Sequence, residues 1–197
     1  MREVVIVATG TANLASVRAA FERLGTEAFV EDDPHKVEHA DFVMLPGVGA
    51  FGASMKRLVQ HRLDQALRTR IKARRPTMAI CVGHQLLFES SDETPTARGL
   101  GVVPGHVGRF PETVRVPQFG WNRVIPEEGC KLLEDGYAYF ANSFRITQAP
   151  ECGIARAGHG GPFVAALERG NLLGCQFHPE LSGDYGMALM QRWLELG

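Results

Sequence analysis

The feature that most constrains this chain is an alternation of short, continuously apolar runs with segments of helical length. Residues 4–8 are typical of a strand, and residues 13–24 follow with apolar side chains at helical spacing and a stop at Gly25. Further strands are predicted at 27–30, 41–45 and 77–82. Because strands without polar alternation are typical of a parallel sheet covered on both faces, the first half predicts a doubly wound α/β fold.

The second half has a different texture, with short strands and turns rich in Gly and Pro from Gly99 onward. We expect its strands to extend the sheet in the antiparallel sense, before a last strand at 172–177 and a closing helix at 185–196. No repeat or linker divides the chain. We therefore predict a single domain over residues 1–197, a three-layer α/β fold with a mostly parallel, mixed sheet and flanking helices.

Charge and hydropathy exclude several classes of function. With 21 Lys and Arg against 22 Asp and Glu, no net field favours nucleic acid or an acidic membrane surface. The longest apolar runs have about five residues, far fewer than the roughly 20 of a membrane helix. No signal peptide is visible and the four cysteines form no CxxC pair, so we expect a cytoplasmic protein with neither a disulfide framework nor a zinc knuckle. The basic segment 68–75 is interpreted as a solvated helix end.

Two short motifs favour other functions. Residues 47–52 match the GxGxxG pattern of dinucleotide sites, but residues 65–88 contain no Asp or Glu at the position where such a site binds ribose. Gly47 and Gly49 instead free the peptide N–H of Val48 to face an anion. A non-catalytic nucleotide-binding module stays open as an alternative.

The second motif lies at residues 35–39, which match the H-x-x-E-H arrangement of some zinc peptidases. The segment leaves room for less than two helical turns in a polar connection. We interpret it as an exposed short helix rather than a metal site.

Cys81 lies where an apolar strand turns directly into a helix. Small residues two positions before and after it, Ala79 and Gly83, permit the sharp turn of a nucleophile elbow. The adjacent helix N-terminus favours a thiolate. Cys81 is therefore a candidate nucleophile.

A general base is expected at the end of the last strand, where His178 and Glu180 lie two residues apart. The carboxyl ends of parallel strands meet at one edge of a doubly wound sheet, so Cys81 and His178 can converge there. A carboxylate that orients an imidazole completes the arrangement needed to activate a thiol. The sequence thus predicts a triad of Cys81, His178 and Glu180.

Five motifs give the chain a resemblance to the class I, triad-type glutamine amidotransferases over essentially its whole length. They are residues 46–51 (Pro-Gly-Val-Gly-Ala-Phe), 81–89 (Cys-Val-Gly-His-Gln-Leu-Leu-Phe-Glu), 120–122 (Gly-Trp-Asn), 139–143 (Tyr-Phe-Ala-Asn-Ser) and 176–183 (Gln-Phe-His-Pro-Glu-Leu-Ser-Gly). The third motif, and the Ser-Gly that ends the fifth, resemble more narrowly the glutaminase subunits of imidazole glycerol phosphate synthase. The resemblance implies the flavodoxin-like fold of this family.

The resemblance also implies a reaction. Cys81 would attack the side-chain amide of glutamine, His178 would protonate the departing ammonia, and water would hydrolyse the glutamyl thioester while Glu180 holds His178. No metal and no cofactor are implied. The family's oxyanion donors fall on the N–H groups of Val48 and Val82, with Gly47 and Gly49 around the former, and its substrate contacts fall on Gln85, Glu93, Ser143 and Phe144.

A partner is implied as well, a cyclase subunit with a (β/α)₈ barrel that forms a 1:1 heterodimer with the glutaminase and receives its ammonia. The matching interface positions are Asn13, Gln118, Trp121 and Leu181. The chain departs from the family pattern at Ala79 (commonly Gly), His84 (commonly Met) and Leu181 (commonly Lys). A glutaminase subunit that serves a different acceptor, or another Cys-His hydrolase, stays open as an alternative.

Overall fold

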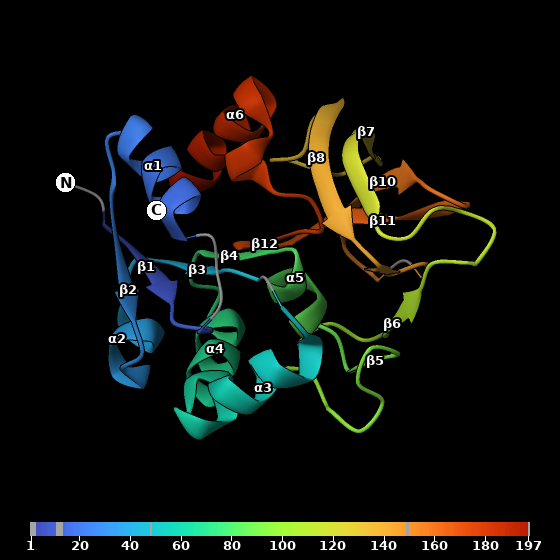
Figure 1. Ribbon diagram of the computed structural model, residues 1–197. Helices are drawn as coiled ribbons and strands as arrows, with labels where there is room; N and C mark the ends of the chain where they lie inside the picture. Colours follow the sequence, from blue (N-terminus) through green and yellow to red (C-terminus); the bar gives the residue numbers. More distant parts are fainter. Residues whose placement is uncertain (1–2, 11–13, 48, 149, 197) are drawn as a thin grey trace.

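A twisted mixed sheet forms the centre of the protein, as seen in a computed structural model that describes residues 3–10, 14–47, 49–148 and 150–196 (Figure 1). In this described part the sheet has nine strands in the order β2-β1-β3-β4-β12-β11-β10-β7-β8. Their bounds are β1 (Glu3–Val7), β2 (Glu27–Glu31), β3 (Phe42–Leu45), β4 (Thr77–Ile80), β7 (Gln118–Pro126), β8 (Gly136–Asn142), β10 (Gly153–Gly158), β11 (Pro162–Arg169) and β12 (Leu172–Cys175).

The sheet changes character at β12. The five strands from β2 to β12 are parallel, and β11, β10, β7 and β8 continue them in antiparallel pairs. The order of the parallel part is that of flavodoxin-like folds. The expected mixed sheet, parallel in its first half and extended by antiparallel strands, is therefore confirmed.

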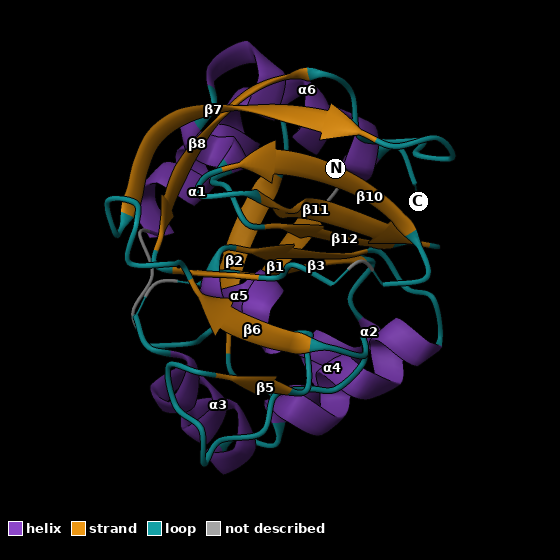
Figure 2. Ribbon diagram, turned by 90° about the vertical axis from the view of Figure 1, so that its right-hand side faces the viewer, coloured by secondary structure: helices purple, strands orange, loops and turns teal. Residues whose placement is uncertain are grey.

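Helices cover both faces of the parallel strands (Figures 1 and 2). On one face lie α1 (Leu14–Arg23), α6 (Gly183–Leu194) and the short 3₁₀ helix η1 (Pro179–Leu181); on the other lie α2 (Pro34–His39), α3 (Phe51–Gln60), α4 (Leu63–Lys72) and α5 (Val82–Leu86). A small second sheet pairs β5 (Ser90–Ser91), β6 (His106–Arg109) and β9 (Phe144–Arg145). This gives the three layers that the sequence predicts.

The core follows from the apolar strands. Every residue of β3, β4 and β12 is buried, which is why these strands show no polar alternation. Above them, the fully buried Trp193 of α6 meets Phe21 of α1 and Phe42 of β3 at ring-centroid distances of 6.3 and 5.2 Å. This aromatic cluster holds α1 and α6 on one face of the sheet.

The segment between β3 and β4 forms two helices, α3 and α4. It breaks at Arg62, which takes a left-handed conformation with φ 57° between α3 and α4. Neither Gly nor Pro lies at this point, so the sequence pattern does not indicate that the helix ends there.

The interpretation of segment 68–75 as a solvated helix end is wrong for Arg70. Its side chain is fully buried and donates to Thr77 and to backbone carbonyls of Val37, Glu38, Ala40 and Pro76. Burial lowers the pKa of its guanidinium to about 10. Arg70 therefore ties the end of α2 to the start of β4.

None of the described helices combines the length and apolar character needed to cross a membrane.

Candidate active site

The candidate nucleophile lies in a strained turn at the carboxyl end of β4. Cys81 has φ 53° and ψ −112°, a conformation that a side chain with a Cβ rarely adopts. Its N–H donates to the carbonyl of Cys175 at 2.7 Å, and its carbonyl accepts the N–H of Gln85 at 3.1 Å, so the strand and α5 hold the turn from both sides. This is the strand-turn-helix elbow that the sequence predicts.

Two glycines are required around this turn because backbones approach there. A Cβ on Gly83 would lie 2.3 Å from the carbonyl oxygen of Leu45, and a Cβ on Gly47 would lie 2.0 Å from the nitrogen of Gly83. Gly47 and Gly83 thus bring the loop after β3 against the start of α5.

The candidate base and its orienting carboxylate lie just beyond β12. His178 Nδ1 and Glu180 Oε1 are 2.8 Å apart, and both residues are buried. The hydroxyl of Ser182 donates to the His178 carbonyl at 2.6 Å and accepts the N–H of Tyr139 at 2.9 Å, which fixes the segment against β8. The predicted pair therefore exists, with the imidazole held by the carboxylate.

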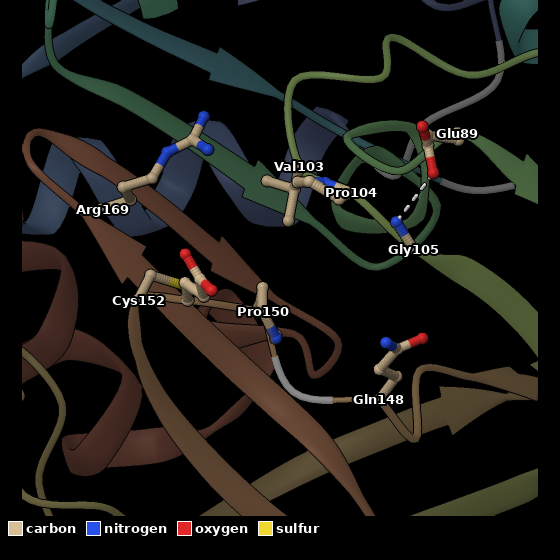
Figure 3. Close-up of a pocket in the computed structure, with 9 residues that line it drawn as sticks. Glu89, Val103, Pro104, Gly105, Gln148, Pro150, Cys152 and Arg169 are labelled. Carbon is tan, nitrogen blue, oxygen red and sulfur yellow. Dashed lines mark hydrogen bonds between the residues drawn. The ribbon is translucent and has the colours of Figure 1, made fainter.

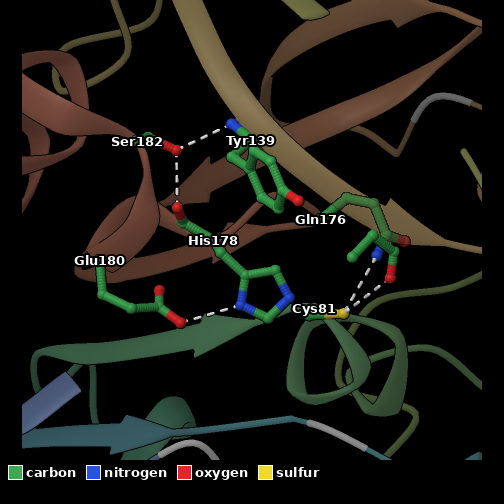
Figure 4. A network of polar contacts seen from close by, with 7 residues as sticks. Cys81, Tyr139, Gln176, His178, Glu180 and Ser182 are labelled. Atoms are coloured by element: carbon green, nitrogen blue, oxygen red, sulfur yellow. Dashed lines mark hydrogen bonds and ion pairs between the residues drawn. The ribbon is translucent and has the colours of Figure 1, made fainter. Parts of the chain in front are cut away.

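Cys81 and His178 meet because β4 and β12 are neighbouring parallel strands, with Ile80 opposite Cys175 in the register. The imidazole faces the sulfur across this edge, while Glu180 holds its far side (Figure 4). Burial alone disfavours the imidazolium, but the neighbouring Cys81 sulfur and the Glu180 carboxylate stabilise it more strongly and raise the pKa of His178 to about 10. At neutral pH the site therefore holds a proton on His178 beside the sulfur.

The other three cysteines have a different setting. Burial, with Glu168 nearby, raises the pKa of the Cys130 thiol to about 12. Burial also raises the pKa values of Cys152 and Cys175, the latter well above its ordinary value. These environments oppose thiolate formation, so geometry and electrostatics single out Cys81 as the candidate nucleophile.

The residues expected to contact substrate lie around this edge in different ways. Gln85 is buried and both of its N–H groups are engaged, by Gln176 Oε1 at 2.9 Å and by the carbonyl of Phe144 at 3.4 Å. The carbonyl of Ser143 accepts the N–H of Phe110, just beyond the paired ends of β6 and β9 in the small sheet. The segment 143–144 is thus held close to Gln85.

Glu93 has a use that the sequence does not reveal. Its Oε2 accepts the N–H of Phe51 at 2.6 Å and so caps the N-terminus of α3, while Thr94 caps the N–H of Gly52. A dinucleotide pyrophosphate would require this helix end. Because the Glu93 carboxylate already accepts from this helix end, the described N-terminus of α3 is poorly suited to a phosphate.

Of the expected oxyanion donors, Val82 begins α5 directly after Cys81 and is buried, whereas Val48 lies outside the described residues. Gly49 has φ 100°, a conformation that favours glycine. The described part therefore places one expected donor, Val82, beside the nucleophile.

The residues expected at the partner interface differ in their exposure to solvent. Trp121 is 59% exposed and Leu181 is 39% exposed, so both reach the surface. Gln118 is only 5% exposed and lies beneath that surface, opposite Asn142 in the β7–β8 pair. Asn13 lies outside the described residues.

Two residues of the site, Gln176 and Asn142, lie within motifs named above, but the sequence assigned them no role of their own. Gln176 is fully buried next to Cys81, and Asn142 donates to the same Phe144 carbonyl as Gln85, at 2.9 Å. Each is an amide in an otherwise apolar strand context, which is the signal that could have identified them.

A cavity of about 600 Å³ lies elsewhere, between the loop after α5 and the start of β10 (Figure 3). Its charged groups are partly engaged, since Glu89 accepts the N–H of Gly105 and Arg169 donates to the carbonyl of Val102. It contains no residue of the triad, so the candidate active site is the Cys81 edge. Its lining residues are Glu89, Val103, Pro104, Gly105, Gln148, Pro150, Glu151, Cys152 and Arg169.

The histidines at 35–39 form no site of their own. His35 and His39 stack at a centroid distance of 4.3 Å, and His39 Nδ1 lies 2.9 Å from the carbonyl oxygen of His35. Across the described ranges, no group of three or more His, Cys, Asp or Glu residues is arranged to hold a metal ion.

Comparison with known proteins agrees with this geometry. A family model described as "Glutamine amidotransferase class-I" matches residues 10–195. The chain belongs to the class-I glutamine amidotransferase family. Within this family, it is 42% identical to imidazole glycerol phosphate synthase subunit HisH of Symbiobacterium thermophilum, over 98% of this chain and 93% of the relative. HisH of Methanothermobacter thermautotrophicus is 38% identical over 98% of both chains.

These identities place this amidotransferase chain among the HisH subunits. Solved structures support the amidotransferase fold at lower identity. A crystal structure described as glutamine amidotransferase superposes with a TM-score of 0.80 at 22% identity, covering 98% of this chain and 97% of the other. PurLQS from Thermotoga maritima gives 0.77 at 18% identity, over 98% of both chains.

Proposed function

We propose that this chain is the glutaminase subunit of an imidazole glycerol phosphate synthase. It hydrolyses L-glutamine to glutamate and ammonia and passes the ammonia to a cyclase subunit, which forms imidazole glycerol phosphate and an aminoimidazole carboxamide ribotide. Residues 1–197 form one domain of the class-I type, and the expected compartment is the cytoplasm.

In the proposed mechanism the Cys81 thiolate attacks the side-chain carbonyl carbon of glutamine. The negative charge that develops on the carbonyl oxygen is stabilised by backbone N–H donors, Val82 in the described part and Val48 by family resemblance. The proton held on His178 moves to the amide nitrogen as the C–N bond breaks, so that ammonia leaves and a glutamyl thioester remains.

Hydrolysis then reverses the roles. His178, now neutral, takes a proton from water, the hydroxide adds to the thioester carbon, and the C–S bond breaks to release glutamate. Glu180 keeps the imidazole oriented and stabilises its charged form through both steps.

The observation that supports the proposal most directly is that Cys81, in its strained turn, lies beside His178, whose Nδ1 is 2.8 Å from Glu180 Oε1. A buried imidazolium beside a cysteine at a helix start is suited to thiol acyl transfer. The choice of glutamine as the substrate is supported by the HisH relatives.

The partner is proposed to be HisF, a (β/α)₈ barrel, in a 1:1 heterodimer. The surface for it is the outer face of the β7–β8 pair together with Leu181. Exposed aromatic side chains gather there, with Phe119 at 72% and Tyr137 at 60% exposure beside Trp121. Phe119 and Trp121 pack on Tyr139 at 5.6 and 6.0 Å, which makes a rigid apolar ridge of the kind found at interface centres.

The proposal is tested by separating two activities of the complex. Cys81→Ser should abolish glutamine-dependent formation of imidazole glycerol phosphate and leave the ammonium-dependent reaction intact. Cys130→Ser is the matched control and should keep both. A Cys81→Ser complex that consumed glutamine at the original rate would refute the assignment, and formation of a different product from the released ammonia would favour another acceptor.

A further inference from the structure

A chain of buried amides runs beneath the candidate active site. Gln176 follows β12 and is fully buried, and Gln85 on α5 is 3% exposed. Gln176 Oε1 accepts from Gln85 Nε2 at 2.9 Å, and Gln176 Nε2 lies 3.9 Å from the Cys81 sulfur (Figure 4). The triad mechanism makes no use of Gln176, yet a buried amide is costly unless its groups are paired.

The orientation of both amides is fixed by a backbone group at the far end. The carbonyl of Phe144 accepts only, so the amide nitrogen of Gln85 must face it, at 3.4 Å. The second N–H of that nitrogen then faces Gln176, which must present its oxygen. Consequently the Gln176 nitrogen is directed toward Cys81, and the chain ends in an N–H donor aimed at sulfur.

We propose that Gln176 is a positioning residue of the glutaminase site, which holds the Cys81 sulfur through its amide N–H and whose direction is set by Gln85 and the Phe144 carbonyl. The inference rests on the proposed function but goes beyond the triad. A donor favours the charged acceptor over the neutral one, so Gln176 stabilises the thiolate.

The groups around the Cys81 sulfur can pair with both its thiol and its thiolate form. The carbonyl oxygen of Ala141 lies 3.9 Å from the sulfur and accepts a hydrogen bond from the thiol, whereas the Gln176 amide donates a hydrogen bond to the thiolate. As the proton moves to His178, the sulfur exchanges one partner for the other with little movement. Because both N–H groups of the Gln85 amide are engaged in this chain of hydrogen bonds, its side-chain oxygen is the group that can contact a ligand.

The test is the pH dependence of alkylation by iodoacetamide in the full chain, with the Cys81 peptide quantified by mass spectrometry. Gln176→Met removes the donor and should move the midpoint of the Cys81 profile upward by about one pH unit, a tenfold loss of thiolate. Gln85 does not contact the sulfur. Gln85→Met should nevertheless move the midpoint in the same direction by a smaller amount, because the Gln176 amide can then turn its nitrogen away from Cys81.

The double variant distinguishes a chain from two separate effects. Gln176→Met with Gln85→Met should match Gln176→Met alone, since the chain is already broken at its end. Gln191→Met, on the surface of α6 where Gln191 pairs with Glu195, is the control and should leave the midpoint unchanged. An unmoved midpoint in Gln176→Met, or strictly additive shifts in the double variant, would overturn the proposal.

If Gln176→Met does not fold, Gln85→Met decides the test by itself, and an unmoved Cys81 midpoint in that variant would overturn the proposal. Alkylation needs no turnover, so its outcome is independent of whether glutamine is the substrate. Glutaminase kinetics add a second readout, with Gln176→Met lowering kcat and Gln85→Met raising KM as well.

Discussion

Replacing His84 by methionine should stabilise the protein, and the gain should grow as the pH falls. His84 lies on α5 one turn after Cys81, fully buried, with its ring against Phe88 at a centroid distance of 5.5 Å. The ring also packs on β12, where a Cβ on Gly174 would come within 2.5 Å of Nδ1. Neither ring nitrogen has a hydrogen-bond partner among the described residues. Burial therefore lowers the pKa of His84 to about 3.

The magnitude follows from proton linkage. Below pH 6.5 the unfolded chain binds a proton on His84 that the folded chain does not bind. The free energy of unfolding therefore decreases as the pH is lowered below 6.5. The loss is about 1.4 kcal/mol per pH unit, which gives about 2 kcal/mol at pH 5 and almost nothing at pH 8. Methionine fills a similar volume without a titratable group or unpaired nitrogens, and so removes this loss.

Urea denaturation of the parent chain and of His84→Met at pH 8, 6 and 5 measures the effect. The difference between the two unfolding free energies should widen by about 2 kcal/mol from pH 8 to pH 5. Gln65→Met, an exposed substitution that removes no titratable group, serves as the control, and its difference from the parent chain should stay constant with pH. Parallel pH profiles for His84→Met and the parent chain would refute the reasoning.

Three further predictions concern the base, the fold and the partner. His178→Asn should reduce glutamine turnover more than Glu180→Gln, because the first removes the proton carrier and the second only loosens its orientation. The losses in rate should be roughly 10² to 10⁴. Steady-state glutamate release measures them, and negligible losses in both variants would contradict the triad. Arg70→Met should lower the free energy of unfolding by about 3 kcal/mol or more in urea titrations, since it leaves buried carbonyls unpaired, whereas the exposed Lys72→Met should have almost no effect. Trp121→Ala should weaken binding of the cyclase in calorimetric titrations and reduce its activation of glutamate release, while glutamate release by the free chain, which we expect to be slow, should not change; unchanged affinity would place the interface elsewhere.

Much of the fold was predictable because its parallel strands are buried on both faces. The runs at 41–45, 77–82 and 172–177 stand out as apolar segments, and all three contain strands of the central sheet. The break at Arg62 was not predictable, since it depends on a left-handed residue other than glycine. Local periodicity reports burial, but it does not report how the chain turns between buried segments.

The triad was predictable for a topological reason, since residues that follow two neighbouring parallel strands must share one edge. The supporting contacts were harder to foresee. Gln176 pairs with Gln85 across 91 residues, and Arg70 reaches carbonyls 30 to 33 residues away in α2 and its C-terminus. No spacing in the sequence encodes such pairs, because they exist only once the sheet has brought the segments together. The same holds for Glu93, whose capping of α3 depends on the loop that follows α5.

The central claim is that Cys81 is the nucleophile that reacts with glutamine bound at this site. A glutamine analogue with a chloromethyl ketone in place of the side-chain amide tests it directly, with the label located by peptide mass spectrometry on the complex with its cyclase. We expect one label per chain, on the peptide that contains Cys81, with protection by glutamine and slower labelling in His178→Asn. Labelling at Cys130, Cys152 or Cys175 instead, or labelling of Cys81 that glutamine cannot prevent, would contradict it.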